Sequence, residues 1–265
     1  MAGEKIDYCR SHGIIHSESF KPISVKSPSA NPFIFWLRCA VDLQLKTIVS
    51  FLKPGLSRVE GKILDVGAGE SPWREWLPDC TTYKGLDLDS ADKFGMTVAR
   101  KEIIYYDGKI IPFDASSFDI VLSVEVLEHV EDPVAFVNEI IRVLKSKGRL
   151  ILTIPFSARR HHTPNDFHRF TREGLHRLLD QCGFVEIVIS ERGNDLCVIA
   201  NKLLVVMLRL LKKPQPFWKI IYRWPIAFLF LPALFISFIV AHLSLLFNFG
   251  SVEDPLGYSV EAKRP

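Results

Sequence analysis

From residue 61 onward, short apolar stretches alternate with segments that have helical spacing. KILDV (62–66), TYKGL (82–86), EIIYY (102–106), SFDIVLSV (117–124), RLILTIP (149–155) and FVEIVIS (184–190) predict six strands. Helices are predicted over residues 132–145 and 171–183, where apolar side chains recur every three or four positions. Strands that alternate with helices over about 130 residues predict a parallel, doubly wound α/β sheet.

Proline, glycine and short polar residues mark the expected helix ends. Ser71 and Pro72 have the residue types of an N-cap and a first helical position, so they predict a helix directly after the first strand. Asp132 and Pro133 predict the start of the helix over 132–145 in the same way, and Gly148 is expected to end it.

The N-terminal part has a different pattern. Residues 1–31 are polar and contain several prolines, which predicts a loose arm, and residues 33–53 predict one helix that ends at Pro54. The first residues contain no apolar stretch typical of a signal peptide. The five cysteines are scattered, which favours a reducing, cytosolic compartment over a disulfide framework. A formal charge of +3 does not indicate a nucleic-acid-binding protein.

The candidate cofactor site follows the first strand, in LDVGAGES. Gly67 and Gly69 allow a tight turn and a close approach of the backbone to a ligand. In an open α/β sheet, ligands bind beyond the carboxyl ends of the strands, where these glycines lie. Asp87 ends the second strand, at the spacing of about 20 residues typical of an acid that binds ribose hydroxyls. A dinucleotide-binding loop would need a third glycine where Pro72 stands, which disfavours a dehydrogenase.

The motifs LDVGAGES, GLDLD, YYDG and IPFDASSFDIVLSVEVLEHVEDP together resemble the class I S-adenosylmethionine (SAM)-dependent methyltransferases. The resemblance runs from about Gly61 to Ser190 and is greatest with the type 11 group, which includes ubiquinone- and menaquinone-pathway methyltransferases. It implies a seven-stranded, Rossmann-like sheet and SAM as the cofactor. The implied cofactor-binding residues are Asp65, Gly67, Gly69, Asp87, Leu88, Asp107 and Gly108.

In such enzymes the glycine loop lies against the methionine part of SAM and the acid at Asp87 binds the ribose. Asp107 and Gly108 would contact the adenine, and Asp65 would support the loop and the cofactor's ammonium group. The turn from Glu70 to Pro72 departs from the pattern of many relatives, so no contact is assigned to it.

Two clusters are candidates for substrate chemistry. Glu125, Glu128 and His129 have the spacing of one helical face and resemble the ExxEH motif of metal-dependent methyltransferases, including small-RNA 2′-O-methyltransferases. Many type 11 members carry the same LEHV sequence in a packing role, so we predict no metal site. The second cluster follows the fifth strand and contains Arg159, Arg160, His161, His162, Asp166, His168 and Arg169.

The second cluster lies where this family forms its acceptor pocket. Histidines can act as general bases near neutral pH, and arginines can bind a phosphate or carboxylate. We predict His162 and His168 as the catalytic residues. The alternative is a polar loop whose histidines have only structural roles.

The C-terminal part is unusually apolar. Residues 196–252 contain no Asp or Glu, and residues 225–249 contain no Asp, Glu, Lys or Arg. The second segment is longer than the stretch of about 20 residues that spans a bilayer. Trp218 and Trp224 are typical of a membrane interface, and Lys202 and Arg209 are spaced for the wet face of an amphipathic helix.

The last segment, 256–265, alternates like a strand and is expected to lie antiparallel beside the sixth strand. The chain must then return to the side that it left, which favours a re-entrant or interfacial helical hairpin, bent with the help of Pro225 and Pro232, over a single crossing. A hydrophobic lid or a dimer interface in a soluble enzyme is the alternative.

The predicted organisation is an N-terminal arm and helix (1–60), a SAM-binding core (61–195), a membrane-associating helical insert (196–252) and a final strand (253–265). The predicted function is O-methylation of a small or amphiphilic acceptor, such as a quinone precursor, a lipid-linked sugar or a lipid, at the cytoplasmic face of a membrane, with no nucleic acid as partner. The alternatives are a metal-assisted RNA 2′-O-methyltransferase and a non-catalytic membrane scaffold with this fold.

Overall fold

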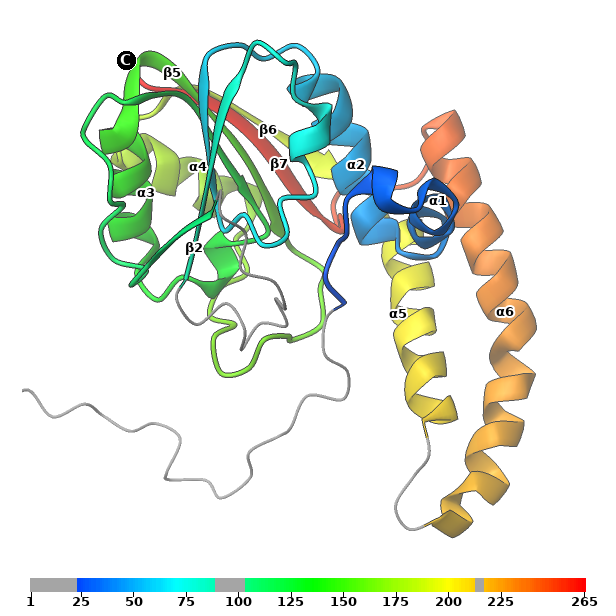
Figure 1. Cartoon of the computed structure of the whole chain (residues 1–265). Helices are drawn as coiled ribbons and strands as arrows, with labels where there is room; N and C mark the ends of the chain where they lie inside the picture. Colours follow the sequence, from blue (N-terminus) through cyan, green and yellow to red (C-terminus); the bar gives the residue numbers. More distant parts are fainter. Residues whose placement is uncertain (1–22, 89–102, 213–216) are drawn as a thin grey trace, which may run out of the picture.

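A seven-stranded sheet with the order β3-β2-β1-β4-β5-β7-β6 forms the centre of the computed structural model (Figure 1). The structure describes residues 23–88, 103–212 and 217–265. β7 is antiparallel to both of its neighbours, and the other paired strands are parallel. The predicted fold is confirmed, including an antiparallel last strand beside the sixth. The strands are β1 (Lys62–Val66), β2 (Thr82–Leu88), β3 (Ile103–Tyr106), β4 (Phe118–Val124), β5 (Leu144–Pro155), β6 (Val185–Arg192) and β7 (Gly257–Lys263).

Helices cover both faces of the sheet. α2 (Leu43–Leu56) packs Leu45, Ile48 and Leu52 against one face, and α3 (Pro133–Val143) and α4 (Arg172–Gln181) pack against the other. The remaining helices described are α1 (Pro32–Val41), α5 (Asp195–Leu211), α6 (Ile220–Phe247) and the short 3-10 helices η1 (Pro28–Ala30), η2 (Arg74–Trp76), η4 (Leu127–His129) and η5 (Phe217–Lys219).

Several predicted helix ends differ from the structure. The single helix predicted over 33–53 is divided at Asp42, whose side chain accepts a hydrogen bond from Leu45 N and caps α2. α2 also continues through Pro54 to Leu56. Asp132 caps α3 as predicted, but the chain passes directly into β5 at Leu144, before Gly148. Most of the arm predicted for residues 1–31 lies outside the described residues.

The helix predicted at Ser71 and Pro72 was wrong. Ser71 is buried with a φ of 52°, and only the three residues of η2 are helical before β2 begins. Trp73 packs into the core on the α2 side of the sheet, which explains why this short segment follows the core instead of forming an exposed helix. The glycine loop therefore has no long helix behind it.

α5 and α6 form a hairpin that leaves the sheet after β6 and returns to it at β7 (Figure 1). Asn194 joins the two ends of the hairpin, because its Nδ2 donates to Ser244 Oγ at 2.9 Å and to the Phe249 carbonyl at 3.0 Å. α6 is continuous through Pro225 and Pro232, so neither proline lies between the two arms of the hairpin. The prediction that these prolines help to bend the hairpin was therefore wrong.

Arg192, at the end of β6, connects the hairpin to the centre of the molecule. Its side chain is buried and donates to Glu125 Oε1 at 2.7 Å, to the Tyr258 carbonyl at 3.1 Å and to the Ile154 carbonyl at 3.2 Å. Burial lowers the pKa of Arg192, and the nearby Glu125 carboxylate opposes that shift. Because a buried guanidinium without its partner is costly, this pair matters for stability.

We expect Glu125→Ala to lower the free energy of unfolding by about 3 kcal/mol, since it leaves the buried guanidinium of Arg192 without its carboxylate partner. The matched control is the Arg149–Glu261 pair, which has the same 2.7 Å contact but side chains that are 37% and 44% exposed. Its removal should cost less than about 1 kcal/mol. Urea unfolding followed by circular dichroism measures both, and equal losses for the two pairs would contradict this account.

Candidate active site

The glycine loop lies at the carboxyl end of β1 and is held against β2. Gly67 N and Ala68 N both donate to the Leu86 carbonyl, at 2.8 and 3.1 Å. Gly67 has a φ of 76°, and a Cβ added there would lie 2.3 Å from Val126 Cγ2. Glycine is therefore required at this position, and the loop contacts the segment that follows β4.

Asp65 lies beneath this loop in an almost fully buried position. Its Oδ2 accepts a 2.7 Å hydrogen bond from the Tyr83 hydroxyl. Burial raises the pKa of Asp65 to about 7, although the Tyr83 hydrogen bond opposes the shift, and the charge of Asp87 adds to it. A carboxyl group of this kind is poised to ionise when a cation binds beside it.

Asp87 ties the glycine loop to the end of β2. Its two oxygens accept from Gly69 N and Leu88 N, both at 2.8 Å. Burial raises the pKa of Asp87, and these two hydrogen bonds oppose the shift. At the end of β3, Asp107 accepts from Lys109 N at 2.9 Å, and a Cβ added to Gly108 would lie 2.7 Å from Leu88 Cδ2.

The structure thus places all seven predicted cofactor-binding residues at the carboxyl ends of three neighbouring parallel strands, which is where ligands bind in such sheets. Their contacts with a cofactor stay a prediction. Tyr83 was missed by sequence analysis, because nothing in TYKGL distinguishes a tyrosine that bonds to Asp65 from an ordinary strand residue.

The segment after β4 does not form the predicted helical face. Glu125 has a φ of 55° and its carboxylate bonds to Arg192, whereas Glu128 and His129 lie in η4. The three side chains therefore do not converge on one ligand. Arg192 was missed because it is separated from Glu125 by 67 positions in the chain.

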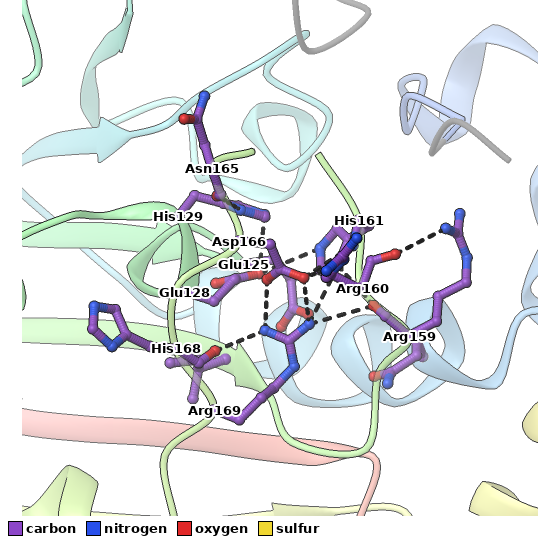
Figure 2. Close-up of polar contacts among 12 residues, drawn as sticks. Glu125, Glu128, His129, Arg159, Arg160, His161, Asn165, Asp166, His168 and Arg169 are labelled. Carbon is purple, nitrogen blue, oxygen red and sulfur yellow. Dashed lines mark hydrogen bonds and ion pairs between the residues drawn. The ribbon is translucent and has the colours of Figure 1, made fainter. Parts of the chain in front are cut away.

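A compact polar cluster does form between η4 and the loop after β5 (Figure 2). Glu128 Oε1 lies 3.5 Å from His129 Nε2 and 3.8 Å from His161 Nε2. The ring of His162 stacks edge-on against His129, with the centroids 5.1 Å apart. The backbone joins the two segments, because Phe167 N and His168 N donate to the Glu128 carbonyl at 2.9 and 3.2 Å.

Burial controls the protonation of this cluster. It lowers the pKa of His161 to about 4, with the nearby His129 acting in the same direction, so the imidazole is neutral near pH 7. Burial and the charge of Glu125 raise the pKa of Glu128 well above its usual range. Both Glu128 oxygens are buried without a hydrogen-bond partner.

The donor set of Glu128, His129 and His161 could hold a divalent cation, since one ligand atom from each lies within 4.8 Å of the others. This set differs from the ExxEH set of the sequence, because His161 takes the place of Glu125. A neutral His161 and an unpartnered Glu128 carboxyl fit such a site. The arrangement of these donor atoms does not test our prediction that no metal binds.

The second predicted base, His168, lies apart from this cluster. Its ring points away from Glu128 in Figure 2 and packs beside Phe170, with the centroids 5.4 Å apart. Its Nε2 is buried without a partner. The arginines of this loop differ in their surroundings. Arg169 donates to both carboxylate oxygens of Asp166, at 2.7 and 2.9 Å, whereas the side chain of Arg160 is exposed.

The profile of a family described as "Methyltransferase domain" matches residues 64–152. A Mycolicibacterium smegmatis protein named "Probable S-adenosylmethionine-dependent methyltransferase" is 31% identical over 133 residues, which are 46% of this chain and 51% of that protein. An uncharacterized Methanocaldococcus jannaschii protein is 32% identical over 116 residues, 43% of this chain and 50% of that one. The chain thus spans about half the length of these curated relatives.

Solved structures share the fold at low identity. The [4+2]-cyclase SpnF superposes with a TM-score of 0.51 and 18% identity, over 84% of this chain and 82% of its own. A chain from the Haloferax volcanii complex of the Trm112 methyltransferase activator with a methyltransferase gives 0.50 and 15%, over 91% and 100%. Since one of these is a cyclase, the fold alone does not specify methyl transfer.

The matched profile and the named relative both cover the strands that carry the glycine loop and its acids, so residues 64–152 are similar to the methyltransferase domain of SAM-dependent methyltransferases.

Proposed function

We propose that this protein transfers a methyl group from SAM to an amphiphilic acceptor at the surface of a membrane. The observation that carries the proposal is the origin of the hairpin. β6 runs in the same direction as β1, so Arg192 and Gly67 both lie at the carboxyl ends of their strands, on the same side of the sheet. α5 starts shortly after Arg192. The hairpin therefore extends from the edge that holds the candidate cofactor site (Figure 1).

The surface of the hairpin suits a bilayer. The helical segment Phe217–Phe247 is long and apolar enough to cross a membrane. Only 11% of the most apolar 18-residue stretch of this segment is buried. Among its exposed side chains are Phe228, Leu229 and Phe235, at 63%, 77% and 68%. Apolar surface of this extent is not typical of a helix that serves only as a core element.

The sheet limits how the hairpin can enter the membrane. β7 lies between β5 and β6, so both ends of the hairpin join one sheet on one side of any bilayer. A single crossing would separate β7 from its neighbours. This supports a re-entrant or interfacial hairpin at the cytoplasmic face, and an acceptor that is itself held in the membrane.

Bound SAM supplies an electrophilic methyl group on a sulfonium. In the proposed site, Asp65 and the glycine loop would hold the cationic methionine part, Asp87 would bind the ribose hydroxyls, and Asp107 with Gly108 would contact the adenine. Methyl transfer to a hydroxyl then needs correct positioning and removal of one proton. His162 or His168 would accept that proton, which favours O-methylation.

A second candidate is metal-assisted methylation, including that of an RNA 2′-hydroxyl. The cluster of Glu128, His129 and His161 favours it, because a cation there could orient a hydroxyl. A non-catalytic membrane scaffold is the alternative from another class, and it would bind SAM without transferring its methyl group.

The test is to incubate the purified protein with membranes and cytosol from its host and with SAM that carries a radiolabelled methyl group. We expect label in the lipid extract and none with Asp87→Ala, because that change removes the ribose ligand. Label in RNA, together with loss of activity in EDTA and its restoration by Mg²⁺ or Mn²⁺, would support the metal-assisted alternative. SAM binding without any labelled product would support the scaffold.

SAM affinity should depend on pH through Asp65. A bound cation favours the ionised carboxylate, so binding releases a proton and affinity falls as pH falls through the pKa of about 7. Between about pH 8 and about pH 5 the Kd should rise by about 100-fold, since the ionised fraction falls tenfold per pH unit below the pKa. Isothermal titration calorimetry measures this. Asp65→Asn should bind weakly with a flat profile, and an equally steep profile in that variant would contradict the role of Asp65.

His162 and His168 can be separated by their effects on kcat. We expect His162→Ala to lower kcat by about 100-fold or more, the usual contribution of a general base, while the Kd for SAM is unchanged. His168→Ala is the comparison variant, because it removes the other candidate base, which lies in the same loop outside the polar cluster, and its kcat should fall less. A larger loss of kcat in His168→Ala would assign the base to His168 instead.

A further inference from the structure

α1 has an exposed apolar face that the fold itself does not use. Phe33, Ile34, Trp36, Leu37 and Val41 are 69%, 58%, 64%, 47% and 45% exposed. α1 contains no acidic residue, and its one basic side chain, Arg38, is turned toward the preceding segment, where it donates to the Ser24 and Ile23 carbonyls, both at 2.6 Å. The outer face of α1 is therefore free of charge.

α1 is attached to the hairpin. His242 Nε2 lies 2.8 Å from the Ala40 carbonyl at the end of α1, and His242 Nδ1 lies 2.6 Å from Lys46 Nζ on α2. Figure 1 shows α1 beside the half of α6 nearest the sheet. Exposed apolar residues continue along that half of α6, among them Ile239, Leu243 and Leu246. We call the exposed apolar residues of α1 and α6 the apolar face.

We propose that α1 is a second membrane-binding element, and that the apolar face as a whole rests in the interface of an anionic bilayer. The inference rests on the membrane part of the proposed function. The orientation follows from α5, where Lys202 is exposed near the middle of the helix and Arg209 lies further along the same helix. A spanning hairpin would bury Lys202 at the depth of the hydrocarbon, where a charge is costly.

An interfacial hairpin avoids that cost, because Lys202 and Arg209 can reach the headgroups while α6 lies deeper. α6 then contacts the bilayer along its whole length, including the half to which α1 is attached, and this brings α1 to the surface too. Tryptophan is enriched at the membrane–water interface. α1 carries Trp36, and the N-terminal part of the second arm carries Trp218 and Trp224.

Charge favours a bilayer over a second copy of the chain as the occupant of this face. Between Leu196 and Phe247 the chain has several basic residues and no acidic ones. Anionic lipid attracts these basic residues, whereas two copies of the chain would bring like charges together.

The test is flotation of the full chain with vesicles of phosphatidylcholine and phosphatidylglycerol in equal parts. Ile34→Glu/Leu37→Glu should weaken the partition coefficient by about tenfold or more, because it places two carboxylates in the apolar face of α1. The matched control is Val188→Glu, which changes a 60% exposed apolar residue on β6. Quenching of tryptophan fluorescence by brominated lipid should be smaller in Trp36→Phe than in the wild type.

If the α1 variant and Trp36→Phe behave like the wild type while Phe228→Glu/Leu229→Glu no longer floats, the role of α1 is overturned and the hairpin still binds the membrane. If the wild-type protein does not float at all, the inference and the membrane part of the proposed function both fail. If the α1 variant converts a dimer into a monomer in sedimentation without lipid, a second copy covers the face and the inference is overturned.

Discussion

β7 can complete the sheet only if the chain returns from α6 to the edge that it left at β6. This constraint determines the form of the apolar insert, because β7 pairs on one side with β5 and on the other with β6. A helix long and apolar enough to cross a membrane is thereby folded back as one arm of a hairpin. Arg192 fixes the root of that hairpin to Glu125, in the segment that follows β4.

The candidate functional groups lie on this same side of the sheet, at the carboxyl ends of the strands. The carboxyl ends of β1, β2 and β3 bring Asp65, Asp87 and Asp107 together, and Gly67 lets the loop pass against Val126. The histidine cluster adjoins this loop through the segment from Val126 to His129. The candidate cofactor site, a group of candidate bases and an apolar hairpin therefore share one side of the protein, and this arrangement supports the proposed action on a membrane-held acceptor.

Sequence analysis predicted the parts of this arrangement that depend on local pattern. Apolar strands, the glycine loop and the acids that follow the strands can be recognised from spacing, and so can the final alternating strand. Helix ends were less predictable: Asp42 resembles any exposed helical residue until its side chain caps Leu45, and Ser71 with Pro72 has the residue types of a helix start without forming one.

Contacts between distant segments could not be predicted in this way. Glu125 has the spacing of a partner for Glu128, but a buried arginine on β6 determines its orientation. The loop after β5 holds three histidines, and only the fold of that loop on the Glu128 carbonyl places His161 and His162 in the cluster and His168 outside it. Local sequence carries no signal for either arrangement.

In the proposed function, the hairpin brings the carboxyl ends of the strands, where the candidate active site lies, to a membrane-held acceptor. The most direct measurement compares the wild type with Phe228→Glu/Leu229→Glu for two properties, SAM affinity and methylation of the acceptor in intact membranes. We expect an unchanged Kd for SAM and a loss of methylation, with activity recovered when the acceptor is presented in detergent micelles. Methylation of the membrane-held acceptor at the wild-type rate by this variant would contradict it.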